Sequence, residues 1–314
     1  MHYRRLGKAG MKVSAISLGA WINLEKGKMP VEDAKAIVRT AYEAGINFFD
    51  IADVYGFGTA EELMGELLAE YSRNTLIVST KVYFEMSEDV NDRGLSRKHI
   101  LESIDRSLKR LNMDYIDIYF CHRADPETEI FETARAMHTL IEQGKVLYWG
   151  TSKWRPEQIV EVCEICERYG LHPPYAEQPQ YSMFYREDVE QNILPVAQKR
   201  GIGLTTYSPL AMGLLSGKYD NGIPDGSRFD KEAWSKERFD FASSVEKAKK
   251  LKPIADDLGI TRAQLATAWL LRKNGVSSVI TGASRAGQVS DNAAAADVEL
   301  SEDVLAKIED VLAG

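Results

Sequence analysis

Four residues that can transfer protons or carry charge follow three neighbouring strands of the predicted sheet. Asp50 ends one strand and Tyr55 comes five residues later, while Lys81 and His122 follow the next two strands. Each alone has an ordinary structural interpretation, as a turn aspartate, a solvated lysine or a hydrogen-bonded histidine. In a closed parallel barrel, however, the carboxyl ends of all strands share one rim, where active sites lie. The four residues therefore predict one common site.

These residue types fit proton donation to an oxygen that gains negative charge. A phenol is a weak acid, with a pKa near 10, and we expect the ammonium of Lys81 to lower the pKa of Tyr55. Asp50 can keep a buried Lys81 charged, and His122 can hold a carbonyl oxygen beside the phenol. The set fits reduction of a carbonyl group, for which a cofactor must supply the hydride. A Schiff base on Lys81, in an unrelated barrel enzyme, remains an alternative.

Short apolar runs alternate with longer amphipathic stretches along the whole chain. The predicted strands are Ala15–Leu18, Asn47–Asp50, Leu76–Thr80, Tyr115–Cys121, Val146–Gly150, Tyr175–Gln178, Leu204–Tyr207 and Val276–Thr281. The predicted helices are Val31–Ala44, Ala60–Tyr71, Arg97–Leu111, Ile130–Glu142, Pro156–Tyr169, Glu187–Lys199, Val245–Leu258, Thr261–Lys273, a short helix near Arg285, and Ser301–Leu312. Such alternation indicates parallel strands joined by helical crossovers.

Two architectures have this alternation, a doubly wound open sheet and a (β/α)8 TIM barrel. No G-x-G-x-x-G fingerprint follows any predicted strand, which weakens the open sheet. Eight units in 314 residues favour the barrel. We therefore expect one barrel domain over residues 1–314. It would carry a long irregular loop, Pro209–Ser243, after strand seven, and an extra C-terminal helix.

The composition excludes some classes of function. The net charge of −8 opposes non-specific binding to nucleic acid or to an anionic membrane. No signal peptide or membrane-spanning segment is predicted. The chain has only three cysteines, Cys121, Cys163 and Cys166. A small, odd number is a poor basis for a disulfide framework, so a reducing, cytoplasmic location is expected. Cys163 and Cys166 fall inside a predicted helix, and neither redox nor metal chemistry is predicted for them.

Three motifs contain the four candidate site residues: G-I-N-F-F-D-I-A-D-V-Y (Gly45–Tyr55), S-T-K ending at Lys81, and C-H-R-A-D-P (Cys121–Pro126). They resemble the aldo-keto reductase family, and the resemblance covers essentially the whole chain. The branch with the potassium-channel β subunits and their bacterial relatives is the most similar. Its marks are Y-W-G-T-S-K-W (Tyr148–Trp154), E-Q-P-Q-Y-S-M-F-Y-R-E (Glu177–Glu187) and Y-S-P-L-A-M-G-L-L-S-G-K-Y (Tyr207–Tyr219).

The resemblance implies NADPH-dependent reduction of aldehydes or ketones, with Tyr55 as general acid and Asp50, Lys81 and His122 completing the catalytic set. Channel β subunits carry Asn where this chain has His122, and the complete set favours a working reductase. Ile51 also departs from a common Thr. The alternative is an NADP(H)-binding regulatory subunit of a membrane channel, with little turnover. Both a monomer and a homo-oligomer, such as the tetramers of the related branch, remain open.

The resemblance also implies an extended NADP(H) across the top of the barrel. Ser152 and Gln178 would hold the carboxamide, Tyr207 would stack on the nicotinamide, and Ser208–Ser216 with Arg228 would follow the pyrophosphate. The full expected set is Trp21, Asp50, Ser152, Gln178, Tyr207, Ser208, Pro209, Leu210, Ala211, Gly213, Ser216, Lys218, Arg228, Gly282, Ser284, Gln288 and Asn292.

Spacing adds an argument for the adenosine end. Ser284, Gln288 and Asn292 are four residues apart, so they share one face of a starting helix, whose free N–H groups attract phosphate. Ser284, Arg285 and Lys218 could bind a 2′-phosphate, which favours NADP(H) over NAD(H). The alternative interpretation is a simple polar helix face, with a solvated Arg285.

Overall fold

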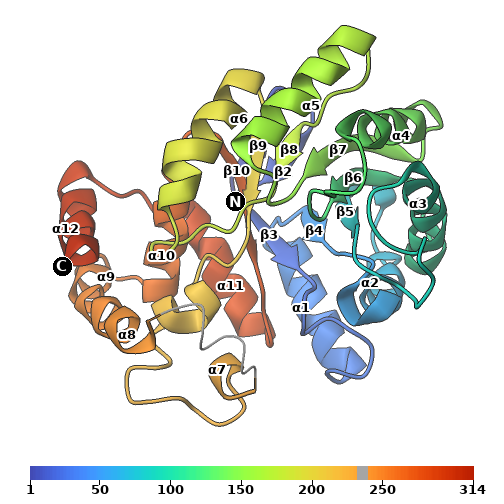
Figure 1. Ribbon diagram of the computed structural model, residues 1–314. Coiled ribbons are helices and arrows are strands. Elements are labelled where there is room, and N and C mark those ends of the chain that lie inside the picture. Colours follow the sequence, from blue (N-terminus) through green and yellow to red (C-terminus); the bar gives the residue numbers. More distant parts are fainter. Residues whose placement is uncertain (232–239) are drawn as a thin grey trace.

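The computed structural model describes residues 1–231 and 240–314. Eight parallel strands close into a barrel in the order β10-β3-β4-β5-β6-β7-β8-β9, surrounded by helices (Figure 1). The strands are β3 (Ile16–Gly19), β4 (Phe48–Asp50), β5 (Ile77–Val82), β6 (Ile116–Cys121), β7 (Val146–Thr151), β8 (Ala176–Glu177), β9 (Gly203–Thr206) and β10 (Val276–Thr281). The predicted (β/α)8 barrel is therefore confirmed.

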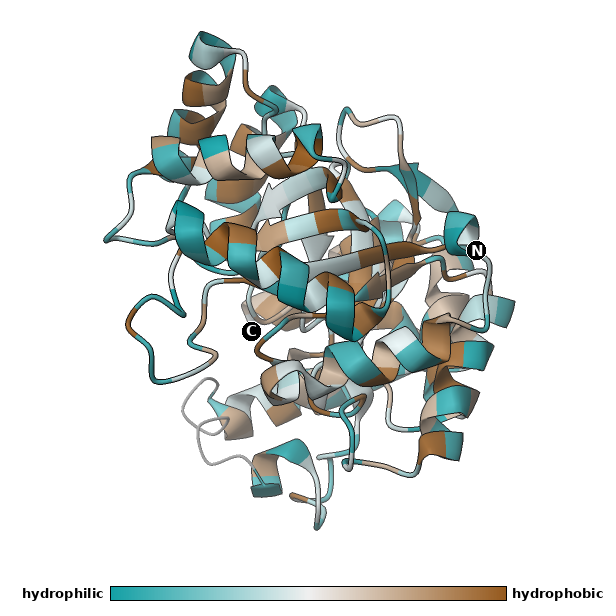
Figure 2. Ribbon diagram, turned by 90° about the vertical axis from the view of Figure 1, so that its right-hand side faces the viewer, coloured by the Kyte–Doolittle hydropathy of each residue, from teal (hydrophilic) through white to brown (hydrophobic). Residues whose placement is uncertain are grey.

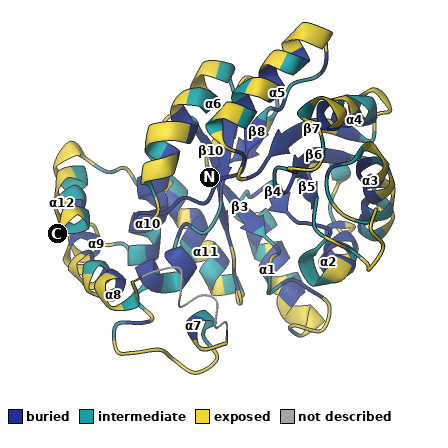
Figure 3. Cartoon of the chain, viewed as in Figure 1, coloured by how far each residue is buried: buried dark blue, intermediate teal, exposed yellow. Residues whose placement is uncertain are grey.

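Amphipathic helices cover the barrel. They are α1 (Val31–Glu43), α2 (Thr59–Leu68), α3 (Arg97–Leu111), α4 (Ile130–Glu142), α5 (Pro156–Tyr169), α6 (Leu194–Arg200), α7 (Arg228–Lys231), α8 (Phe241–Lys250), α9 (Lys252–Asp257), α10 (Arg262–Leu271), α11 (Ala286–Ala294) and α12 (Glu302–Ala313). Apolar and polar residues alternate along most of them (Figure 2). Their outer faces are exposed while the strands are buried (Figure 3), except in α10, which is buried from Leu265 to Leu271. No helix in the described part of the chain is long and apolar enough to cross a membrane.

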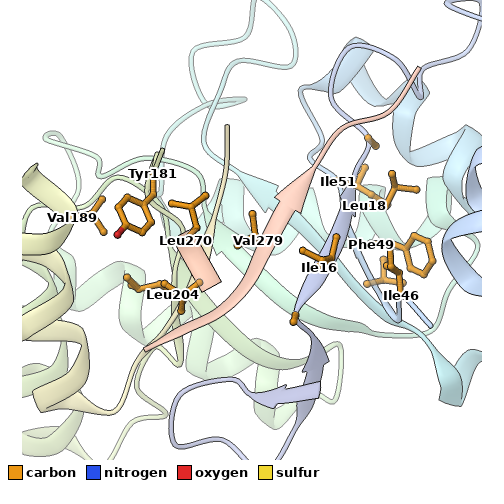
Figure 4. Packing of buried hydrophobic residues seen from close by; sticks show 14 of the residues in the cluster. Ile16, Leu18, Ile46, Phe49, Ile51, Tyr181, Val189, Leu204, Leu270 and Val279 are labelled. Atoms are coloured by element: carbon orange, nitrogen blue, oxygen red, sulfur yellow. The ribbon is translucent and has the colours of Figure 1, made fainter. Parts of the chain in front are cut away.

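The core has two parts, because successive strand residues point to opposite sides of the barrel wall. Phe49 belongs to the larger cluster, which lies between strands and helices and is shown in part in Figure 4. Its neighbour Phe48 belongs to a smaller cluster with Ile118, Phe120 and Ala176. This smaller cluster fills the lumen. Cys121, Cys163 and Cys166 are buried free thiols of the larger cluster.

A short antiparallel hairpin was not expected from the sequence. Its strands, β1 (Tyr3–Arg5) and β2 (Lys12–Ser14), are only three residues long and rich in charge. The hairpin turn contributes Leu6 and Ala9 to the lumen cluster, so it closes the N-terminal end of the barrel. The opposite end, where the strands finish, is left for polar side chains.

The long loop after β9 and the extra C-terminal helix are confirmed, with more local order than predicted. The loop contains a 3-10 segment, Ala211–Ser216, and α7, and Tyr219 and Phe229 stack edge to face at 5.0 Å. Residues 232–239 of the predicted loop lie outside the described residues. The single helix predicted over Val245–Leu258 is wrong, because α8 ends and α9 begins around Leu251, with a proline in the first turn of α9.

Candidate active site

The alternation of each strand directs three of the four expected residues into the lumen. Phe48 and Phe120 face the lumen, so Asp50 and His122, two residues further on, face the same way. Ser79 lies beside Asp50 across the β4–β5 ladder, and Lys81 lies beside Phe120 across the β5–β6 ladder. The three side chains therefore meet above the packed lumen at the C-terminal rim.

Asp50 and Lys81 form a buried ion pair. The Nζ atom of Lys81 donates to Oδ2 of Asp50 and to the carbonyl oxygen of Ile51, both at 2.6 Å. The other Asp50 oxygen accepts from the Ser79 hydroxyl at 2.7 Å and from the Gln178 amide at 2.9 Å. Lys81 is fully buried, and burial lowers its pKa, which Asp50 opposes. A buried pair of this kind persists only because its remaining hydrogen-bonding groups are also satisfied.

Tyr55 lies on a tight turn directly after β4. Gly56 and Phe57 have left-handed backbones, with φ of 56° and 51°. A Cβ atom on Gly56 would lie 2.2 Å from the Thr59 hydroxyl oxygen, so the turn requires glycine there. The Tyr55 hydroxyl lies 3.4 Å from Nζ of Lys81. The structure thus brings all four expected residues together.

The expected lowering of the Tyr55 pKa by Lys81 is wrong. The pKa of Tyr55 is raised well above its usual value of 10, first by burial and then by Asp50, with Arg123 opposing. The main physical reason is burial, which disfavours the charged phenolate. Asp50 neutralises the Lys81 cation at 2.6 Å, so the phenol faces an ion pair rather than a free ammonium. Tyr55 is therefore protonated at neutral pH and can act as a proton donor.

His122 faces Tyr55 across the rim. Their rings meet edge to face with centroids 5.9 Å apart, and Phe84 packs on the other side of the imidazole at 4.9 Å. Burial, and then the charges of Lys81 and Arg123, lower the His122 pKa well below its usual value. The imidazole is neutral at pH 7, so it has one N–H to donate to a substrate oxygen. Its Nδ1 atom is buried and has no hydrogen-bond partner among the described residues.

Sequence reasoning missed a buried polar network beneath the turn that carries Tyr55. Glu61 of α2 is fully buried and accepts from the Thr80 hydroxyl at 2.5 Å and from Nε of Arg110 at 2.6 Å. Asp53 accepts from the amide of Val54 at 2.6 Å. Burial and the nearby Glu61 raise the pKa of Asp53 well above its usual range. Acidic residues in a predicted helix look solvated, so only the fold reveals this network.

The residues expected around a nicotinamide lie on the same rim. The Ser152 hydroxyl donates to the carbonyl oxygen of Gln178 at 2.9 Å, and the Gln178 amide reaches Asp50. Trp21 is 37% exposed, and its ring centroid is 6.4 Å from that of Tyr55. Tyr207 follows β9, and its amide donates to the carbonyl of Pro179 at 3.1 Å. These side chains form a polar floor beside the Asp50–Lys81 pair, with an aromatic edge.

The loop expected along a pyrophosphate has an unusual backbone. Three non-glycine residues in five, Ser208, Ala211 and Met212, have positive φ angles of 58°, 46° and 58°. Pro209, Leu210 and Gly213 complete the turn, and the Ser216 hydroxyl donates to the carbonyl of Gly213 at 2.7 Å. Backbone strain of this kind gathers at ligand-binding loops.

The next groups expected to bind the cofactor flank that loop. Lys218 follows Ser216, and its Nζ lies 4.9 Å from the Tyr219 ring centroid. The Arg228 guanidinium lies 5.0 Å from the ring centroid of Trp21. Two cationic side chains therefore frame the segment expected to follow the pyrophosphate.

Of the residues expected at the adenosine end, Ser284 lies just before α11, and Gln288 and Asn292 lie one turn apart on one face of it. The Gln288 side chain accepts from the amide of Ser284 at 2.8 Å and from its hydroxyl at 3.2 Å. Asn292 is buried and donates to the carbonyl of Gly282 at 3.5 Å. Arg285 is exposed at the same helix start. The four-residue spacing therefore predicted the common face of Gln288 and Asn292, whereas Ser284 contacts Gln288 from outside the helix.

A third unexpected buried acid, Glu177, lies beside Gln178 in the sequence. It is fully buried, accepts from the Thr151 hydroxyl at 2.6 Å and from the Lys153 amide at 2.7 Å, and burial raises its pKa to about 7. The folded protein therefore holds a proton on Glu177 that the unfolded chain releases above a pKa of about 4.5. The contribution of Glu177 to folding stability therefore falls as pH rises through this interval, and levels off above pH 7.

We expect Glu177→Gln to remove this pH dependence. Relative to the variant, the wild type should lose about 2 kcal/mol of unfolding free energy between pH 5 and pH 8. Chemical denaturation of both proteins at several pH values measures the difference. Glu161→Gln, at an exposed position of α5, is the control and should follow the wild-type profile. A constant offset between Glu177→Gln and wild type at every pH would contradict the prediction.

Comparison of the chain with known proteins places it in an existing family. The Aldo/keto reductase family matches residues 15–313. A protein of Arabidopsis thaliana named "Probable voltage-gated potassium channel subunit beta" is 47% identical over 319 residues, covering 99% of this chain and 97% of its own length. A protein of the same name from Oryza sativa subsp. japonica is 45% identical over the same coverage.

Proposed function

The chain belongs to the aldo/keto reductase family, and on that basis we propose that it reduces aldehydes or ketones to alcohols with NADPH. One observation carries the proposal. A protonated phenol, a neutral imidazole and a buried Lys–Asp pair converge on one rim, with the Tyr55 hydroxyl 3.4 Å from Nζ of Lys81. These groups can hold a carbonyl oxygen and give it a proton.

Each residue has a separate part in the proposed reaction. The Tyr55 hydroxyl binds the carbonyl oxygen and transfers its proton as negative charge develops there. The neutral His122 ring donates a second hydrogen bond to the same oxygen and so orients the substrate. Asp50 keeps Lys81 in position, and the Lys81 ammonium adjoins the phenol oxygen that loses its proton. NADPH, when bound, supplies the hydride.

Features of the chain support a dinucleotide beside this rim. Gln288 presents an amide group in the first turn of α11, where the helix N-terminus favours phosphate, and Asn292 lies one turn further on the same helix face. The strained loop at Ser208–Met212 and the cations of Lys218 and Arg228 fit a diphosphate. In the proposal Ser152 and Gln178 hold the carboxamide, Tyr207 stacks on the ring, Trp21 borders it, and Ser284 with Arg285 contacts the 2′-phosphate. These hydroxyl, amide and cationic side chains are suited to binding NADP(H).

The proposal is tested by cofactor titration followed by an activity screen. We expect NADPH to bind more tightly than NADH in a fluorescence titration. We expect steady NADPH consumption when a panel of aldehydes and ketones is added. Absence of turnover with every carbonyl, in protein that retains NADPH, would reject the reductase and leave the binding function.

That binding function is a second candidate, supported by the two relatives named as potassium channel β subunits. In it the chain is a regulatory NADP(H)-binding subunit that docks on a channel. Slow turnover, tight cofactor retention and co-purification with a channel would favour it. His122 favours the reductase, because it supplies the second hydrogen bond to a carbonyl oxygen.

A further inference from the structure

Three side chains that can bind a metal meet outside the proposed active site. His138 and Glu142 are four residues apart on α4, and His172 lies in the connection between α5 and β8. One ligand atom from each lies within 4.8 Å of the others, and no other such group of three occurs among the described residues. Because α4 ends where β7 begins, the cluster lies at the N-terminal end of the barrel, opposite the Tyr55 rim.

We propose that His138, Glu142 and His172 form a Zn²⁺ site. Two imidazole nitrogens and one carboxylate oxygen are a common zinc donor set, and neutral imidazole suits zinc better than magnesium or calcium. Nε2 of His172 lies 2.9 Å from Oε1 of Glu142. In a tetrahedral site with zinc bonds of 2.0–2.1 Å, donor atoms are about 3.3 Å apart. This pair therefore needs only a small adjustment to hold one ion.

The backbone around His172 is already held in position. Its carbonyl oxygen accepts from Nε1 of the buried Trp149 at 2.8 Å. Its amide donates to Nδ1 of His138 at 3.3 Å, and the two imidazole centroids are 5.1 Å apart. A neutral imidazole has one nitrogen lone pair, so zinc binding would replace this amide bond. At 3.3 Å the bond is long, and the part-buried His172 amide would have to bind water in its place.

An ion pair between His172 and Glu142 explains the position of these two residues but not that of His138. The pair of His2 and Asp297, at 3.1 Å, is the simpler arrangement on this protein. At the proposed site a second imidazole, that of His138 one turn before Glu142 on α4, lies against the His172–Glu142 pair. Glu142 is exposed and the two histidines are half-buried, so water can complete the coordination. A bound ion would join α4 to the connection before β8.

The experiment uses the full chain without an affinity tag, stripped of metal with EDTA. We expect titration against a chromophoric zinc chelator to show one equivalent of Zn²⁺ bound in the micromolar range. Zinc at about 100 times Kd should raise Tm by about 4 °C, because the ion binds only the folded chain. Mg²⁺ should leave Tm unchanged. Substitution of Co²⁺ should give the intense visible absorption of a tetrahedral site.

Two variants separate this site from general surface binding. Glu142→Gln and His172→Gln should each weaken zinc binding about tenfold or more, since each removes one of three ligands. His2→Asn is the control, because His2 pairs with Asp297 outside the proposed site, and the variant should bind zinc at His138, Glu142 and His172 as the wild type does. Circular dichroism checks that all three variants are folded. The proposal is overturned if wild type binds no zinc in this range, or if both ligand variants bind it unchanged.

Discussion

Tyr55→Phe is expected to lower kcat for aldehyde reduction by about 10²–10⁴-fold, the usual contribution of a positioned general acid. The substitution removes the one hydroxyl that lies 3.4 Å from Lys81 and keeps the ring that packs against Trp21 and His122. Because the Tyr55 pKa is raised, the wild-type phenol stays protonated through neutral pH. The loss should therefore be similar from pH 6 to pH 8.

The measurement is steady-state NADPH consumption at saturating aldehyde, with NADPH affinity measured separately by fluorescence. Cofactor affinity should change little, because the hydroxyl is assigned to the carbonyl oxygen. Tyr169→Phe is the control, since Tyr169 is 54% exposed on α5, and its kcat should equal that of wild type. Full turnover in Tyr55→Phe would show that another group or water supplies the proton.

Glu61→Ala is expected to lower the free energy of unfolding by about 3–5 kcal/mol, as breaking a buried ion pair does. The Glu61 carboxylate is fully buried and accepts from Arg110 and Thr80. Alanine would leave the Arg110 guanidinium and the Thr80 hydroxyl without their acceptor, in a position that water does not reach freely. The cost is mainly this uncompensated burial rather than the energy of the pair itself.

Denaturant unfolding at pH 7 measures the change, and the neighbouring residue provides the control. Glu62 is the next residue of α2, is 44% exposed, and pairs with Lys26 on the surface. Glu62→Ala should cost less than about 1 kcal/mol, as exposed pairs do. Equal losses in the two variants would mean that the buried network contributes nothing beyond helix propensity.

Local pattern in the sequence predicted the barrel and the location of the candidate site residues. Period-two alternation in β4, β5 and β6 determines which side chains face the lumen, and residues at strand ends share one rim. Asp50, Lys81 and His122 were therefore predictable from spacing. The same holds for Gln288 and Asn292, because four-residue spacing on a helix fixes a common face. Such arguments need only the geometry of one element.

Contacts between distant elements were beyond this reasoning. Glu61 and Arg110 are 49 residues apart, and nothing local marks either as buried. The hairpin β1–β2 is stabilised by capping the lumen rather than by its own short strands. His138 and His172 meet only because α4 and the connection before β8 pack together.

The direction of the Tyr55 pKa shift shows most clearly which properties follow from the sequence and which from the folded structure. The sequence by itself determined that a phenol, an ammonium and a carboxylate share one rim. Only the tertiary structure decided that Asp50 lies 2.6 Å from Lys81 and cancels its charge, leaving burial to govern the phenol. Spacing along a strand or helix sets the direction in which a side chain points. The interaction between charged groups depends instead on their distance and burial, and these are fixed only when distant elements meet in the folded chain.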